Sequence, residues 1–168
     1  MAIGKRSLAE GATLYTPAER LRRDNTVWTF VQAVLAPLQF LVFGVSLIFV
    51  LRYLGTGEGY WIATVSVCVK TLILYTIMVT GAIWEKAVFG QYLFAPAFFW
   101  EDVFSMLVLA LHTLYLIVTV FALGGPDAQM WIALAAYAAY VINAGQFLLK
   151  LRRARLEQPA ALEVGELA

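Results

Sequence analysis

Three carboxyl groups and one lysine gather in the short segment 84–102, together with seven aromatic rings. The segment reads WEKAVFGQYLFAPAFFWED, and its ionisable residues are Glu85, Lys86, Glu101 and Asp102. Ordinary connecting loops are small and polar, whereas this one sets acids beside apolar side chains, where ionisable groups are costly and commonly functional. Neighbouring carboxyl groups in such surroundings suit proton transfer, one acting as acid and the other as base. The segment is therefore the first candidate for an active site.

Long apolar segments on both sides must position these acids. Hydrophobic residues make up 62% of the 168-residue chain and charged residues 14%, a balance far too apolar for a soluble domain. Four segments are long enough to cross about 30 Å of hydrocarbon, at residues 27–51, 60–83, 103–123 and 130–149. The sequence therefore predicts an all-α integral membrane protein, a four-transmembrane-helix bundle with short connections.

Basic residues are shared unequally between the two ends of this predicted bundle. They precede the first span and follow the fourth, whereas Arg52 is the basic residue of the opposite side. By the positive-inside rule, both termini and segment 84–102 are expected to be cytoplasmic. We expect a cytoplasmic N-terminal segment 1–26 with a short basic amphipathic helix, a four-span membrane domain 27–149, and a cytoplasmic tail 150–168 that is basic and then flexible.

Two local features add detail. Residues 16–19, TPAE, have the pattern of a helix start, with Thr16 as the N-cap, a proline at the first helical position and Glu19 closing a capping box. They predict that the short N-terminal helix begins there. Cys68 is the one cysteine of the chain, so no intramolecular disulfide can form, and we interpret it as a small buried hydrophobe.

Polar residues inside the spans fall on distinct helix faces. Glu101 and His112 share one stripe of the third span, because eleven residues at about 100° each return close to the same direction. Gln39 of the first span and Asn143 of the fourth lie on polar faces as well. With these faces turned inward, the bundle would enclose a polar-walled pocket that opens toward the cytoplasm. Lys70 lies in the half of the second span nearer the periplasm, and we expect its side chain to extend toward that interface.

Each of these groups also has an ordinary structural interpretation. His112 is equally suited to be a metal ligand, an acid or base, or a hydrogen-bond partner of a neighbouring helix. Gln39 and Asn143 are typical of interhelical hydrogen bonds, and Trp84 and Trp100 of an aromatic belt at the membrane surface. The two acids that open the third span are typical of a helix start. These interpretations do not explain why three acids and so many rings cluster in one connector.

Motifs of soluble enzymes are missing from the sequence. It has no glycine-rich phosphate loop, no CxxC, HExxH or GxSxG motif, and no dinucleotide-binding fingerprint. One histidine and one cysteine cannot build a multi-ligand metal centre. The basic residues are few and are explained by membrane orientation, so we expect no nucleic-acid partner.

Four segments of the chain carry an unusual, long pattern. They read YTPAERLRRDNTVWT (15–29), LAPLQFLVFGVSL (35–47), TLILYTIMVTGAIWEKAVFGQYLFAPAFFWEDVFSMLVLALHTLYL (71–116) and YVINAGQFLLKLR (140–152). Together they resemble the vinyl bacteriochlorophyllide hydratase family, over nearly the whole chain from Tyr15 to Arg155. The resemblance implies a hydro-lyase of bacteriochlorophyll biosynthesis in the inner or intracytoplasmic membrane of a phototrophic bacterium. Such an enzyme hydrates the ring-A vinyl group of chlorophyllide a, or of a vinyl bacteriochlorophyllide, to 1-hydroxyethyl.

The resemblance also implies the partners of the protein. They are the chlorin substrate, the lipid membrane, and either a second copy of the chain or other enzymes of pigment biosynthesis. No redox cofactor is implied, and no metal of the protein's own beyond the magnesium that the substrate carries.

The implied reaction assigns roles to the candidate residues. Protonation of the terminal vinyl carbon would be followed by attack of water on the carbon next to the ring, which needs a protonated carboxylic acid and a group that orients water. On this hypothesis Glu101 is the acid, and Asp102 or Glu85 orients the water. His112 is a candidate axial ligand for the chlorin magnesium, and Lys86 a candidate partner of the pigment propionate. The other expected substrate-binding residues are Trp84, Trp100, Gln39 and Asn143.

Two functions of other classes compete with hydration. The protein could bind or deliver a pigment without reacting with it, or serve as an assembly subunit of a photosystem whose aromatic connector is a protein interface. The acids discriminate between these alternatives, because hydration requires a titratable group whereas binding tolerates its amide isostere.

Overall fold

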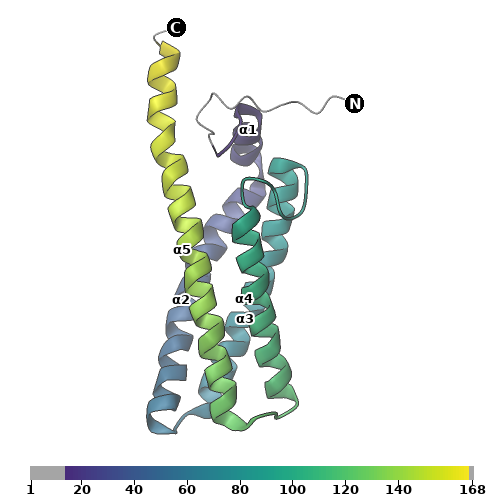
Figure 1. Ribbon diagram of the computed structural model, residues 1–168, viewed down its shortest axis with the longest axis vertical. Helices are drawn as coiled ribbons and strands as arrows, with labels where there is room; N and C mark the ends of the chain where they lie inside the picture. The colour runs from purple at the N-terminus through teal and green to yellow at the C-terminus, as the bar shows by residue number, and fades with distance from the viewer. Residues whose placement is uncertain (1–13, 167–168) are drawn as a thin grey trace.

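A computed structural model describes the backbone of residues 14–166 and the side chains of residues 14–155. The described chain is helical, in the order α1 (Pro17–Asn25), α2 (Val27–Thr56), α3 (Tyr60–Phe89), α4 (Phe99–Val120) and α5 (Gly125–Glu166) (Figure 1). The prediction of an all-α architecture is confirmed. Of the predicted N-terminal segment, residues 1–13 lie outside the described residues.

Helices α2 to α5 are long and apolar enough to cross a membrane, as the sequence predicts. Only 22–33% of the most apolar window of each helix is buried inside the protein, so most of its hydrophobic side chains face outward. Large exposed side chains such as Phe30, Ile48 and Trp61 would be unfavourable in water and suit a lipid surround. The first two spans begin at the predicted residues, and α4 begins four residues before its predicted span.

The bundle is built from two helical hairpins. Helix α2 packs most closely on α3, and α4 on α5, while the hairpins touch each other more sparsely through α2–α5 and α3–α4. The turn between α2 and α3 is short because Gly57 and Gly59 both adopt positive φ angles, 73° and 84°. Figure 1 shows α1, the connector 90–98 and the far part of α5 at one end of the bundle, which we call the connector end.

The sequence pattern at residues 16–19 acts as predicted. The Thr16 hydroxyl accepts a hydrogen bond from the Glu19 amide, and the Glu19 carboxylate accepts one from the Thr16 amide at 2.8 Å. This reciprocal capping box starts α1, which packs against α3. At the other terminus, α5 continues as one helix through Glu166, so most of the predicted tail 150–168 is helical in the structure. The flexibility of that tail stays a prediction.

Two hydrophobic clusters hold the helices together. The larger one fills the middle of the bundle and includes Phe43, Val50, Val67, Val108, Tyr115 and Tyr137. The smaller one lies at the connector end and consists mainly of aromatic rings, with Tyr15, Trp84, Phe89, Phe98 and Phe147 in contact. Three of the seven rings of segment 84–102 are therefore packing side chains of this second cluster, which we call the aromatic cluster.

Candidate active site

The three acids of the connector segment meet at the connector end of the bundle. Glu85 lies in the last turns of α3, and Glu101 and Asp102 occupy the first turn of α4, as expected for acids near a helix start. The intervening residues 90–98 fold back so that these helix ends lie beside each other. All three side chains are buried, with 4–6% of their surface exposed. The structure thus brings together the acids that the sequence singles out.

Glu85 and Asp102 form a directly coupled pair. Their carboxyl groups are close enough to interact, and both are buried. Because two carboxylates in one buried site repel each other, such a pair is suited to share one proton. Each carboxyl group also accepts a backbone N–H of the connector: Asp102 from Phe94 at 2.7 Å, and Glu85 from Ala95 at 3.2 Å. The pair is therefore suited to hold or release one proton while each carboxyl group keeps its backbone donor.

The Phe94 backbone shows how closely the connector is fitted to these acids. Phe94 has a φ of 59°, in the left-handed region that residues other than glycine rarely adopt. Its amide donates to Asp102, which compensates for the unfavourable backbone conformation. Sequence reasoning did not anticipate this contact, because nothing in the letters 90–98 marks Phe94 as a left-handed residue.

Glu101 has a different partner. Its carboxylate forms an ion pair with Lys150 of α5 at 2.5 Å, and the same ammonium donates to the backbone oxygen of Ala97. Lys150 also lies over the ring of Phe98, 5.0 Å from its centroid. Glu101 thus has an adjacent cation, whereas Glu85 and Asp102 have none among their described hydrogen-bond partners. The sequence analysis did not include Lys150 in the site.

The two tryptophans of the segment differ in their surroundings. Trp84 packs edge-on against Phe98, with ring centroids 5.6 Å apart, and its indole N–H donates to the Thr29 hydroxyl at 2.9 Å. Trp100 is 66% exposed on the outer surface of the bundle. Trp84 is therefore fixed within the aromatic cluster, and Trp100 is a surface ring that precedes Glu101 in the sequence.

Lys86 has a structural role in the protein. Its ammonium donates to the backbone oxygen of Gly90 at 2.7 Å and lies 5.4 Å from the centroid of the Tyr92 ring. It thereby satisfies a carbonyl at the C-terminal end of α3, where cations are favourable. The side chain is exposed, so a contact with a substrate carboxylate stays a prediction.

The position of Lys70 contradicts the sequence analysis. The side chain is fully buried instead of extending to the membrane surface. Its Nζ lies 2.8 Å from Nε2 of His112, which is fully buried as well. The outward prediction was wrong because it considered only the position of Lys70 along its helix; a polar partner on α4 and the Tyr140 ring on α5, 4.0 Å away, draw the ammonium inward.

Both ring nitrogens of His112 are engaged. Nδ1 lies 2.8 Å from the Val108 carbonyl oxygen, which can only accept, so Nδ1 carries the proton. Nε2 then offers its lone pair to the Lys70 ammonium. Ligation of magnesium by His112 would require this second bond to break, and the predicted axial role stays a prediction.

Gln39 and Asn143 are buried on facing hairpins. The Asn143 amide donates to the Ser105 hydroxyl at 2.8 Å. The side-chain oxygens of Gln39 and Asn143 are buried and have no hydrogen-bond partner among the described residues. Buried polar atoms without a described partner are therefore found on both hairpins, on α2 and on α5.

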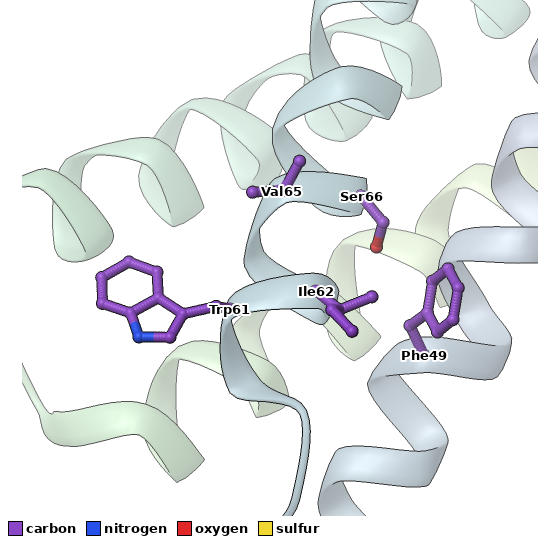
Figure 2. A pocket seen from close by; sticks show the side chains of 5 residues that line it. All are labelled: Phe49, Trp61, Ile62, Val65 and Ser66. Carbon is purple, nitrogen blue, oxygen red and sulfur yellow. The ribbon is translucent and has the colours of Figure 1, made fainter.

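A pocket of about 360 Å³ lies at the opposite end of the molecule, between α2 and α3. Figure 2 shows Phe49, Ile62 and Ser66 at the crossing of the two helices and Trp61 directed away from it. Its lining is apolar and its mouth is wide, as expected for a surface crevice in contact with lipid. The polar pocket expected at the connector end stays a prediction. Within the described part of the chain, no cluster of three or more His, Cys, Asp or Glu side chains could hold a metal ion.

Comparisons with known proteins give one consistent result. The family model described as 2-vinyl bacteriochlorophyllide hydratase matches residues 15–153. A 2-vinyl bacteriochlorophyllide hydratase of Rhodobacter capsulatus is 71% identical over 157 residues, which cover 92% of this chain and 89% of the relative. A protein with the same description from Cereibacter sphaeroides is 70% identical over 151 residues, covering 88% and 92%. No solved structure matches the chain.

Proposed function

The chain belongs to the 2-vinyl bacteriochlorophyllide hydratase family, and from this membership we infer that it is a hydro-lyase of bacteriochlorophyll biosynthesis. It adds water to the vinyl group of a vinyl bacteriochlorophyllide. The observation that carries this conclusion is the family match over residues 15–153, which includes the whole connector and its acids. In finer detail, we propose that the reacting group is the ring-A vinyl of chlorophyllide a or its bacteriochlorophyllide counterpart, and that the product is the 1-hydroxyethyl pigment.

The reaction needs one proton to be delivered and one to be recovered. A proton added to the terminal vinyl carbon leaves positive charge on the carbon next to the ring, where the macrocycle delocalises it. Water then forms a C–O bond to that carbon and loses a proton. The sum is the addition of one water, with the acid returned to its starting state and no change in oxidation state.

We propose that the Glu85–Asp102 pair carries this proton. The proton shared by the two carboxyl groups would pass to the vinyl carbon, and the backbone N–H groups of Phe94 and Ala95 would stabilise the charge that remains. The pair would then take back the proton that the attacking water loses. Its burial beside the aromatic cluster excludes bulk water that would otherwise compete for the proton.

Glu101 then has a role other than that of the acid, which its position in the sequence suggested. On this proposal its carboxylate, already paired with the Lys150 ammonium, accepts a hydrogen bond from water and does not donate the proton. We propose that Glu101 orients the attacking water and that Lys150 fixes its carboxylate in place. Lys150 is a positioning residue on this account, because it acts through Glu101.

The tryptophans have separate roles in the proposed site. Trp84, held by Thr29 and packed on Phe98, would supply the apolar wall against which ring A of the macrocycle lies. Trp100, exposed on the outer surface, would meet a pigment that arrives through the lipid. A homo-oligomer or a neighbouring pigment-biosynthesis enzyme would dock on such an outer surface.

We propose that the connector end faces the cytoplasm and that the protein resides in the inner or intracytoplasmic membrane. The exposed cations Arg152, Arg153 and Arg155 follow Lys150 on α5 at that end, in keeping with the positive-inside rule. A water molecule for the reaction is then available next to the acids, at the boundary between lipid and cytoplasm.

The test is hydration by membranes from a host that makes no chlorophyll, supplied with vinyl bacteriochlorophyllide. The native protein should give a product heavier by one water, with a red absorption band shifted to the blue because vinyl conjugation is lost. Glu85→Gln and Asp102→Asn should keep the pigment but lose the product, and the exposed control Glu58→Gln should behave as the native protein does. Near-normal turnover by Glu85→Gln, with loss in Glu101→Gln, would return the acid role to Glu101. Retention of pigment without product by the native protein would indicate a pigment carrier instead.

A further inference from the structure

We propose that Lys70, at the centre of the bundle, binds the propionate carboxylate of the substrate, and that His112 positions it. This proposal rests on the proposed function, because a bacteriochlorophyllide is the pigment whose propionate side chain is a free acid. The evidence comes from the charge, surroundings and depth of Lys70, and from its distance to the Glu85–Asp102 pair.

Lys70 is a buried amine that has no counter-ion among the described residues. The ion pairs among the described residues are Arg23–Asp24 and Lys150–Glu101, and neither involves Lys70. An ammonium removed from water and left unpaired is strongly unfavourable, so buried lysines normally face an anion. Because the described protein supplies none at this position, the anion that fits the position is one that a ligand brings.

The groups that face Lys70 are neutral, and they do not accept all of the N–H donors of its ammonium. His112 accepts one N–H through Nε2, since its Nδ1 proton is committed to Val108. The Tyr140 ring lies 4.0 Å and the Tyr137 ring 5.5 Å from Nζ, so aromatic faces cover the ammonium on the α5 side. An ammonium has three donors, and a carboxylate accepts two of them readily. His112 and the two rings thus hold the ammonium in position for an incoming carboxylate.

Lys70 also lies where a ligand would enter between the hairpins. It belongs to α3, whereas His112 and Tyr140 belong to α4 and α5, so the contact joins the two hairpins across their sparser interface. Buried side-chain oxygens without a described partner occur on both hairpins, on Gln39 of α2 and Asn143 of α5. A flat macrocycle that separates the hairpins slightly would replace contacts that are few and in part unsatisfied.

The separation of the two polar centres matches the shape of the substrate. Asp102 and His112 are ten residues apart on α4, which places them about 15 Å apart along the helix axis. The vinyl and propionate groups of a chlorophyllide project from neighbouring pyrrole rings, at the corners that point away from each other, and one molecule with both groups extended spans roughly that length. With the vinyl group at the Glu85–Asp102 pair, the carboxylate therefore reaches the level of Lys70.

The alternative cation for this role is Lys86, which the sequence suggested. Its ammonium is already bonded to the Gly90 carbonyl and exposed to solvent, so it has no unmet need for an anion. It also follows Glu85 directly in the chain, which would place vinyl and propionate contacts at the same end of one molecule. The geometry therefore favours Lys70.

The experiment compares the free-acid substrate with its propionate methyl ester, which removes the charge and leaves the vinyl group unchanged. We expect the native protein to have a KM about tenfold or more lower for the acid, because a desolvated charge pair is lost in the ester. Lys70→Met should lose this preference, with the KM for the acid rising to that for the ester and kcat on the ester retained. Lys70→Arg should restore part of the preference, and the exposed control Arg52→Met should keep all of it.

Defined results would overturn the proposal. An undiminished preference in Lys70→Met, or equal KM values for the two substrates in the native protein, would remove Lys70 from this role. Collapse of the preference in Lys86→Met alone would assign the carboxylate to Lys86. If the native protein hydrates neither substrate, the proposed hydratase function is wrong, and this result alone does not decide the role of Lys70. Pigment retention, measured by fluorescence of the acid and the ester on native and Lys70→Met membranes, then still decides whether Lys70 binds the carboxylate.

Discussion

The two buried polar centres of this protein are built in opposite ways. At the connector end, Glu85 and Asp102 accept backbone amides of the irregular connector 90–98, and Glu101 pairs with Lys150 of α5. At the centre of the bundle, Lys70 and His112 rest on regular helices and have only neutral neighbours among the described residues. The first centre is equipped to move a proton, and the second to hold a charge still. Separating them along one bundle lets a single flat substrate touch both.

The two centres differ in the backbone that holds them, the irregular connector in one case and regular helices in the other, and this affects how each responds to substitutions. The Glu85–Asp102 pair is held by connector amides, one of them on the strained Phe94 backbone, so small shifts of the connector change the pair directly. The Lys70–His112 contact is fixed by helix packing and depends on the distance between the hairpins. Substitutions that affect one centre and not the other therefore test whether the two have separate roles.

The largest effect is expected from the acid pair treated as a unit. Glu85→Gln and Asp102→Asn should each lower kcat by about 100-fold to 10,000-fold, because each leaves the pair without its shared proton or its acceptor. The double variant should be scarcely worse than either single one, since groups that act as a unit are strongly non-additive. Single-turnover rates on membranes with matched protein levels would measure this. Additive losses would mean that the two carboxyl groups act separately.

A smaller effect, on stability, is expected from Lys150→Met. Removing the cation leaves the buried Glu101 carboxylate and the Ala97 carbonyl without their donor, which should cost about 2 kcal/mol. Thermal unfolding in detergent should therefore show a lower Tm than for the native protein. Adding Glu101→Gln to this variant should recover much of the loss, because no charge is then left unpaired. A Tm unchanged by Lys150→Met would mean that this ion pair contributes little to the connector end.

His112→Ala separates ligation of magnesium from positioning of Lys70. If His112 acts through Lys70, its loss should raise KM about tenfold for the magnesium pigment and for the metal-free pigment alike. An axial ligand would instead affect only the magnesium form. The preference for the free acid over the methyl ester, measured in the same variant, should decrease as KM rises.

The smallest effect is expected at α1. Thr16→Ala removes the capping box and should destabilise that helix by about 1 kcal/mol. Because Tyr15 stacks on Phe89 in the aromatic cluster, loosening α1 should modestly lower turnover at the acids. It should leave the preference of the central site for the free acid unchanged. A change in that preference would show that the two centres are coupled.

The elements that the sequence predicts well are those whose signals are local. The capping box at Thr16, the start of α2 at Val27 and the acids in the first turn of α4 depend on residues within a few positions of one another. The family resemblance and the location of the candidate site also come from one continuous segment. These predictions do not need to know how the helices are rotated against each other.

The pairings inside the site could not be predicted in this way. Lys70 meets His112 across 42 positions, and Glu101 meets Lys150 across 49. Helical periodicity states which residues share a face but not which face of another helix lies opposite. The sequence analysis therefore predicted that the Lys70 side chain extends outward and that Glu101 is the acid. In the structure Lys70 is buried, and Glu101 pairs with the Lys150 cation.

The late position of Lys150 sets the order in which the protein can be assembled during translation. Chains emerge from the ribosome from the N-terminus, so α2, α3 and the connector acids enter the membrane before the residue that neutralises Glu101 has been synthesised. Until α5 arrives, the aromatic cluster also lacks Phe147. A chain that ends before α5 therefore contains one complete hairpin, α2–α3, and a helix α4 whose Glu101 lacks its cation.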